Sequence, residues 1–509
     1  RRRPRPTLFP YTTLFRSEYL KPLLASDSLQ RTLSRTERQQ LEYARVEFRE
    51  ELATAAASTS LTKAVRHPWI DPWLPDTIYL NGRNLLAVES APFRLYLDPI
   101  VKSQRLWATA DSLDGEEKVF ENGNGLRLWG SAGRFGYYID VRDHQEWGSR
   151  DYPGIVNYTR ERLGFVRGNA HGLDHDETTA YILYTQKYFS LCFGKDVNRW
   201  GPGSAGQLAL SDHPTSYDQL KFSLGNDRIK FTSLTAVLQH YSDTFFDNGH
   251  EEKYLAAHRL EMAPWSWLNI GLHETIIYGG RKFEAAYLNP VMFYRSAEHY
   301  LGDRDNATMG LDFEWFALCK TKLYGELFID DISTGKLNSG FYGNKFAYTV
   351  GAWHVNTLGI SDLNLRAEYT RIRPHTYNHS GITGYWHYNT LLGHWSGPNS
   401  DHVLLEAAWR PTQPLSLKGS AGWRRHGANP VGSNVGGDPF VMRDPDRDPE
   451  FVSFLDGQRE STSSISLQAS YEFLRDAYLQ LSWRSARYEQ AAAQGLATGR
   501  RNEDRKSVV

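Results

Sequence analysis

The dominant pattern along this chain is an alternation of apolar and polar residues with a period of two, which starts near residue 94. Between residues 464 and 473 the odd positions are apolar, as in Ile465, Leu467 and Tyr471, and the even positions are polar or charged. Segments 363–370, 415–424 and 479–484 show a similar division. Because successive side chains of a strand point to opposite faces, each segment predicts a strand with one apolar and one polar face.

The connections between the predicted strands alternate between tight turns and long loops. We predict seventeen strands, at 94–102, 124–131, 133–146, 178–186, 187–194, 216–224, 228–240, 253–261, 265–276, 306–317, 319–330, 344–356, 360–373, 402–410, 413–425, 462–473 and 475–488. In an up-and-down cylinder successive connections leave from opposite rims, so this alternation places every long loop on one side. Outer-membrane barrels have that asymmetry, whereas a soluble sheet with one wet face does not require it. The predicted fold is therefore all-β: a transmembrane antiparallel up-and-down β-barrel with a short helical N-terminal region.

The two ends of the chain determine the expected strand number and domain boundaries. A bacterial single-chain barrel has an even number of strands, so we expect about 18, with the last strand missing. Residues 1–17 resemble translated sequencing-adapter sequence, and the terminal DRKSVV raises the same suspicion, so the native export signal and C-terminus are expected to be lost. We expect a non-native segment at 1–17, an N-terminal periplasmic region at 18–93 with an amphipathic helix near 27–57, the barrel at 94–490, and a non-barrel tail at 491–509, partly non-native.

Composition excludes several classes of protein. The formal net charge of −1 gives no electrostatic reason to expect a nucleic-acid partner. Cys192 and Cys319 have no metal-ligand spacing and form no disulfide framework. The sequence lacks a run of about eighteen apolar residues, which excludes a helical membrane span. Aromatics such as Trp409, Trp423 and Tyr471 occur on the apolar faces near predicted strand ends, as expected of interfacial girdles.

No compact catalytic motif is present, so the sequence offers no positive case for an enzyme. The acidic run at 444–450 could bind calcium, but it lacks the glycine turn of an EF-hand and a solvated loop is favoured. We expect neither a metal site nor a cofactor. Charges on the polar faces are of mixed sign, among them Arg366, Glu406 and Lys418, which favours a salt-bridged interior over a conduit.

Aromatic residues in the predicted long loops are the candidates for ligand binding. Aromatic faces stack on the C–H faces of sugars, and neighbouring polar groups hydrogen-bond to hydroxyls. The candidate polysaccharide contacts are Arg199, Trp200, Tyr385, Trp386, Tyr388 and Trp395. For any single residue, packing within the loops is an equally good explanation.

Several segments resemble the capsule assembly Wzi family in the form found in Bacteroidetes-type bacteria. They are the GKDVNRWGPG stretch at 194–203, LALS at 208–211, HRLE at 258–261, YLNP at 287–290 and LYGELFIDD at 323–331. The stretch at 194–203 is the most specific, and the resemblance covers about residues 60 to 488.

The resemblance implies an outer-membrane lectin-like barrel that helps attach capsular or exopolysaccharide to the cell surface of a Gram-negative bacterium, without catalysis or cofactor. The expected partners are that polysaccharide and outer-membrane lipid, and we expect a monomer. An outer-membrane diffusion or transport channel is the main alternative, because a cylinder of this size leaves a lumen unless something fills it. A membrane-embedded hydrolase or acyltransferase would need a nucleophile and a base at one rim, and no spacing in the sequence supplies them.

Overall fold

Antiparallel strands make up most of the structure, a computed structural model that describes residues 84–90, 92–110, 116–148, 166–168, 172–226, 228–239, 252–318, 320–379, 381–490 and 499–508, together with Leu41. The main strands are β2 (Phe93–Ala110), β3 (Glu116–Ala132), β4 (Phe135–Gly148), β6 (Gly172–Thr185), β7 (Phe189–Asp196), β8 (Tyr217–Gly225), β9 (Ile229–Leu238), β10 (Lys253–Trp265), β11 (Leu268–Gly279), β12 (Asn306–Leu318), β13 (Thr321–Asp331), β14 (Lys345–His354), β15 (Leu363–Ile372), β18 (Ser400–Thr412), β19 (Leu415–Ala428), β20 (Gln458–Leu474), β21 (Ala477–Gln490) and β22 (Gly499–Val508). They form an 18-strand up-and-down sheet, which confirms the predicted fold.

The remaining elements are short. β1 (Leu86–Ser90) and β5 (Val166–Gly168) pair with β2 and β6, and β16 (Trp386–His387) pairs with β17 (Thr390–Leu391). Within the described part of the chain from residue 84 onward, the helices are α6 (Ala285–Leu288), α7 (Tyr294–Tyr300), η3 (Thr334–Lys336), η4 (Thr357–Gly359) and η5 (Gly381–Thr383). Among the described residues, no helix has the length and apolar character needed to cross a membrane. The helix predicted near 27–57 lies outside the described residues except for Leu41.

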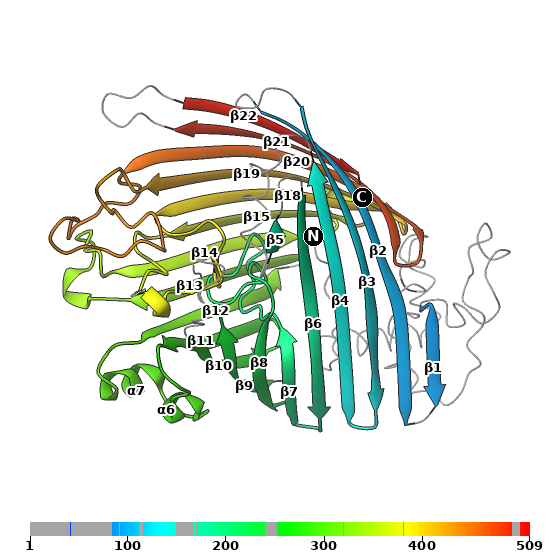
Figure 1. Cartoon of the computed structure of the whole chain (residues 1–509), viewed down its shortest axis with the longest axis horizontal. Coiled ribbons are helices and arrows are strands. Elements are labelled where there is room, and N and C mark those ends of the chain that lie inside the picture. The colour runs from blue at the N-terminus through cyan, green and yellow to red at the C-terminus, as the bar shows by residue number, and fades with distance from the viewer. Residues whose placement is uncertain are drawn as a thin grey trace.

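Each of the seventeen predicted strands overlaps one of the observed strands from β2 to β21. The first two strands were predicted too short, because β2 continues to Ala110 and β3 begins at Glu116. The predicted alternation of connections is confirmed: short connections follow β3, β6, β8, β10, β12, β14, β18 and β20, and longer ones follow β4, β7, β9, β11, β13, β15 and β19. Figure 1 shows several long connections together at one end of the strands, including the one that carries α6 and α7.

The prediction that the last strand is missing was wrong. β22 pairs with β21 from Leu481↔Val508 to Gln490↔Gly499, and with β2 from Arg105↔Val508 to Ala110↔Glu503. The expected non-barrel tail at 491–509 is accordingly wrong for Gly499–Val508. The sequence GRRNEDRKSV lacks the alternating pattern used to find strands, but pairing requires only main-chain N–H and C=O groups. β1 pairs with the first residues of β2, so β1 and β22 lie along the same edge of β2.

The apolar face of the strands points outward. Leu405, Leu467 and Leu481 expose about half of their surface, and the predicted girdle residues Trp409, Trp423 and Tyr471 are similarly exposed. The opposite, inward face carries charged groups such as Arg366, Glu368 and Glu406. Arg366 lies opposite Glu406 across β15 and β18, and Glu368 is the next inward residue of β15. An apolar exterior around a polar interior is the arrangement that lipid requires of a barrel wall.

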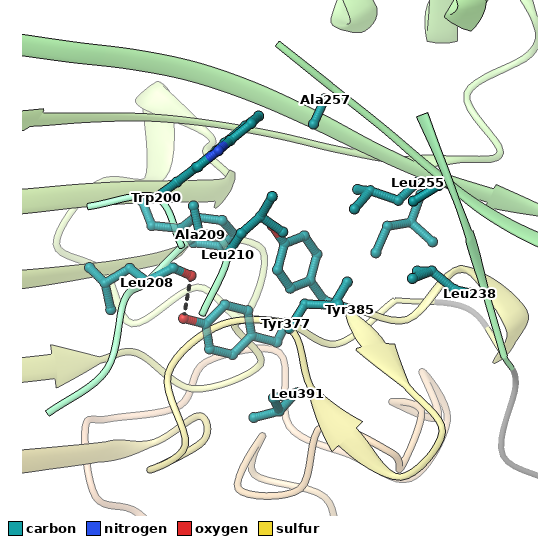
Figure 2. Close-up of a cluster of buried hydrophobic side chains, with 14 of the residues drawn as sticks. Trp200, Leu208, Ala209, Leu210, Leu238, Leu255, Ala257, Tyr377, Tyr385 and Leu391 are labelled. Carbon is teal, nitrogen blue, oxygen red and sulfur yellow. Dashed lines mark hydrogen bonds between the residues drawn. The ribbon is translucent and has the colours of Figure 1, made fainter. Parts of the chain in front are cut away.

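Part of the interior is filled by two of the long connections. Residues 197–216, between β7 and β8, and residues 373–399, between β15 and β18, pack against the inward faces of β8–β11 and β13–β15. Leu208, Leu210, Tyr377 and Tyr385 form the centre of this cluster, as Figure 2 shows. We call these segments loop A (197–216) and loop B (373–399).

Candidate functional site

Loop A is held inside the barrel by two carboxylates from the wall. Glu326 of β13 accepts hydrogen bonds from the backbone N–H of Gly203 at 2.6 Å and of Leu208 at 2.8 Å. Glu368 of β15 accepts from the N–H of Ser204 at 2.6 Å and of Ala205 at 2.8 Å. Four backbone N–H groups of loop A are thus hydrogen-bonded to carboxylates. Buried main-chain groups need such partners.

The glycines of the tryptophan-glycine-proline-glycine stretch are required by this arrangement. Gly201 has a φ of +117°, which L side chains rarely adopt, and a Cβ there would lie 2.5 Å from the Glu326 carboxylate. A Cβ at Gly203 would lie 2.2 Å from the carbonyl oxygen of Gly206. The absence of a side chain at both positions, together with the positive φ of Gly201, lets the main chain approach the carboxylate.

Trp200 packs inside the barrel and is only 6% exposed. Its backbone N–H donates to the carbonyl of Leu210 at 2.8 Å, which closes loop A on itself. The guanidinium of Arg259 lies 6.0 Å from the centre of a Trp200 ring and is held by a bidentate pair with Asp312, at 2.5 and 2.9 Å. Trp200 therefore packs loop A against the inside of the barrel wall in this structure.

Loop B lies over loop A and is bonded to it. The Tyr377 hydroxyl donates to the carbonyl of Leu208 at 2.8 Å, drawn as the dashed line in Figure 2. The backbone N–H of Tyr377 donates to Asp330 of β13 at 2.6 Å. The Ser211 hydroxyl contacts the carbonyl of Gly393 at 2.7 Å. The two loops and the wall form one packed unit.

Tyr385 and Trp386 are buried in loop B, at 0% and 4% exposure. The Tyr385 ring stacks on Tyr377, with ring centres 5.5 Å apart. The ammonium of Lys253 lies 4.5 Å from the centre of a Trp386 ring and donates to the carbonyl of Gly384 at 2.8 Å. The rings of these two residues, both predicted to contact polysaccharide, are therefore already in contact with other side chains of the protein.

Three of the six predicted contacts keep accessible surface. Trp395 is 40% exposed, Arg199 is exposed and Tyr388 is half-buried. Arg199 and Trp395 come from loops that touch each other, since a Cβ at Gly206 of loop A would lie 2.8 Å from the His394 ring of loop B. The structure thus separates the predicted residues into a buried group and an accessible group.

The charged groups of the interior are paired with one another. Glu406 lies 3.9 Å from Arg366 and forms a close ion pair with Lys418. This supports the salt-bridged interior predicted from the sequence. In the acidic run, Asp448 accepts from the backbone N–H of Asn434 at 2.8 Å and of Asp444 at 2.7 Å. Among the described residues, no group of three or more His, Cys, Asp or Glu side chains is placed to hold a metal ion.

Loop B also contains several buried histidines. Burial lowers the pKa of His375 to about 4, with a further contribution from Lys345 and Arg443. Burial lowers the pKa of His387 to about 3, and Lys253 adds to this effect. His379 has a pKa of about 4 for the same main reason. These imidazoles are therefore neutral at ordinary pH in the packed loop.

The sequence did not single out Glu326 as part of the site. It stands in the LYGELFIDD stretch, and its even position in the alternation of β13 does place it on the inward face. What was missing is the long-range contact, because Glu326 and its partner Gly203 are 123 residues apart. No local pattern in the sequence encodes that separation.

Comparison with known proteins gives the following matches. The family profile described as capsule assembly protein Wzi matches residues 154–493. No curated protein matches the chain. The solved structure of Wzi from Escherichia coli, described as an outer-membrane, carbohydrate-binding β-barrel involved in group 1 capsule assembly, shares 14% identity, with 80% of this chain and 84% of that chain covered and a TM-score of 0.48. Pseudomonas aeruginosa OprD shares 11% identity over 81% of this chain and 94% of that one, with a TM-score of 0.43.

Proposed function

The chain belongs to the capsule assembly protein Wzi family, which places it in the bacterial outer membrane, and from this premise we propose that it binds capsular or exopolysaccharide and helps attach it to the cell surface. The long connections of the barrel carry the binding surface in this proposal. The observation that carries it is the pair of interlocked loops A and B, which present Arg199 and Trp395 from a fixed platform.

The packed interior argues for binding rather than passage. The side chains of loops A and B fill the space beside β8–β11 and β13–β15 with a continuous apolar cluster. A diffusion channel of this strand number needs a water-filled lumen. Loop A is bonded to the wall through Glu326 and Glu368, and loop B through Asp330, so both are fixed in the interior where a channel would need open water.

Direct sugar contact is assigned to the accessible residues. Trp395 offers an indole face that can stack on the C–H face of a sugar ring, and Arg199 and Tyr388 offer donors for hydroxyl or carboxylate groups. Trp200, Tyr385 and Trp386 support the loops from below in this proposal. Their replacement would lower binding through loss of the platform.

The finer features expected from the sequence are part of the proposal. The motif at 194–203 supports a Bacteroidetes-type member of the family. We propose that the chain acts as a monomer without catalysis, and that residues 18–93 include a periplasmic region.

The test is binding of the purified full chain to an array of immobilised bacterial capsular polysaccharides. Trp395→Ala combined with Arg199→Ala should lower the affinity for a bound polysaccharide about tenfold or more, equivalent to about 1.4 kcal/mol. Trp409→Ala is the matched control, because Trp409 is 39% exposed on the outward face of β18. Unchanged binding by the double variant would show that these residues do not contact the sugar, and a wild-type chain that binds no polysaccharide would rule out the proposed function.

A further inference from the structure

The connection between β11 and β12 folds over the outside of the barrel, in contrast to loops A and B. Residues 280–305, here called the flap, contain α6 and α7. Tyr287, Tyr294 and Ala297 of the flap pack against Tyr254, Ala256, Ile276 and Tyr278 of β10 and β11. In Figure 1 the two helices lie beyond the ends of these strands, on the side of the long connections.

The register of β10 and β11 shows that the flap covers the lipid-facing wall. Tyr254↔Tyr278 and Ala256↔Ile276 share a face with Leu260↔Leu272, and Leu272 is 42% exposed on the exterior. The intervening pair Leu255↔Ile277 belongs to the interior cluster. The flap therefore lies against the apolar exterior.

Polar contacts hold the flap in place. The Tyr294 hydroxyl lies 2.7 Å from His258 Nε2, and the backbone N–H of Arg295 donates to Glu274 at 3.0 Å. Both His258 and Glu274 are on the outward face, where an uncovered polar group would be costly in lipid. Within the flap, Arg281 forms a bidentate pair with Asp305, at 2.8 and 2.6 Å.

A pocket of about 430 Å³ opens on the wall directly below the flap. Its lining includes Phe231, Leu260, Leu272, Met309 and Leu327, which come from five successive strands, and Phe293 of the flap. Phe293 is 56% exposed, so its ring is available to an occupant. This volume is within the usual range for sites that bind small molecules, roughly 300–1,000 Å³.

We propose that this pocket holds one acyl chain of a lipid A-type glycolipid of the outer leaflet, with the flap as its clamp. Apart from His258, His273 and Glu274, the side chains of the lining are hydrocarbon or aromatic, and they are continuous with the lipid-facing band of the barrel. The flap belongs to the rim with the long connections, which in an outer-membrane barrel is the outer-leaflet side. Lys282 and Arg304 are exposed on the flap and can reach lipid phosphate. This inference goes beyond polysaccharide binding and does not depend on it.

The first test is photo-crosslinking of the full wild-type chain in nanodiscs that contain lipid A with a photoreactive acyl chain. Crosslinks should concentrate on peptides that contain Phe231, Leu260, Phe293 and Met309. Phosphatidylethanolamine with the same photoreactive chain should label the outward wall without this concentration. Equal labelling by both lipids, or crosslinks spread evenly around the barrel, would overturn the proposal.

The second test is the amount of lipid A retained by the detergent-purified chain in native mass spectrometry. Leu272→Trp fills the pocket and Phe293→Ala removes its roof, and each should lower retained lipid A about fivefold or more, since methylene contacts are lost. Leu405→Trp and Phe313→Ala are the controls, because these residues are exposed on the outward face and do not line the pocket. The far-UV circular dichroism of each variant checks folding. Loss of lipid A to the same extent in the controls would contradict a specific site.

Discussion

Glu326 and Glu368 show how a few side chains can fix an entire loop inside a barrel. Each accepts two main-chain N–H groups of loop A, and Glu368 also accepts the Tyr324 hydroxyl at 2.6 Å. A buried donor that loses its acceptor costs about 1–3 kcal/mol, more than a typical hydrogen bond contributes when it forms. Removal of an acceptor is therefore more informative at this site than removal of an apolar contact.

Glu326→Leu should release the part of loop A that includes Gly203 and Leu208. Two buried N–H groups lose their acceptor, at a cost of about 1–3 kcal/mol each. Hydrogen–deuterium exchange of the peptide that spans 203–208 should speed up by at least about tenfold. Gln468→Leu, an inward polar position on β20, is the control and should leave this exchange unchanged. Equal exchange in Glu326→Leu and wild type would contradict the assigned role.

The histidines of loop B predict a dependence of loop packing on pH. The pKa values of His375 and His387 are about 4 and about 3 in the packed loop, because burial opposes the charged form. In a released loop each imidazole would have the ordinary histidine pKa of about 6.5 and would bind a proton below that pH. The packed state should therefore be fully favoured above about pH 6.5 and lose stability as the pH falls from 6.5 toward 4.

Limited proteolysis of loop B at pH 7.5 and pH 5 measures this effect. Cleavage within residues 373–399 should be faster at pH 5 in the wild-type chain. In the double variant His375→Asn and His387→Asn the difference between the two pH values should shrink. Cleavage that is independent of pH in the wild type would show that these histidines do not control packing.

The choice among the loop aromatics could not be made from sequence. Trp200 and Trp395 are both tryptophans beside polar residues in long loops, yet one is 6% and the other 40% exposed. Trp200 belongs to the buried apolar cluster and lies beside Arg259 of β10, whereas Trp395 contacts His402 of β18 and stays accessible. Such contacts depend on where distant strands lie around the barrel, which residue type does not encode.

At the scale of elements, the period of two identified strands wherever one face meets lipid. Ile465, Leu467 and Tyr471 of β20 are all exposed on the outward face. The method failed for β22, whose residues do not alternate, and it shortened β2 and β3, where segments such as Glu121-Asn122-Gly123 are polar on both faces. The outward packing of the flap was also missed, because its tyrosines contact residues of two different strands, β10 and β11, and the local pattern of the loop does not show those contacts.

Arginine substitutions on the two faces of β20 should differ in their cost. Leu467→Arg places a charge on the lipid-facing surface and should destabilise the barrel by roughly 2–4 kcal/mol near the middle of the membrane. Ser466→Arg, one residue away, faces the interior and should cost much less. Urea unfolding in lipid vesicles measures both. Equal costs would contradict the assignment of the outward face.

At the scale of the whole molecule, the barrel is a closed wall with an occupied interior. β22 completes the sheet by pairing with β2, and loops A and B pack against seven strands of the wall. A barrel of this size without interior loops would leave an aqueous channel. The difference between the two is measurable as an electrical conductance.

The wild-type chain in a planar lipid bilayer should show little or no single-channel conductance. Replacement of residues 376–397 by a short Gly-Ser linker removes most of loop B and should produce stable, measurable openings. A variant with Val431→Ser, on an exposed position of the connection between β19 and β20, is the control and should remain silent. Large wild-type conductance would favour the channel function over binding.

The bonds between loop A and the wall also limit the order in which the protein can assemble. Loop A follows β7, but its acceptors Glu326 and Glu368 are on β13 and β15, 123 and 164 residues away from their partners. Loop A therefore has no acceptor to dock on until β13 and β15 are both part of the wall. An assembly intermediate that lacks these two strands would carry an unfilled, water-accessible interior.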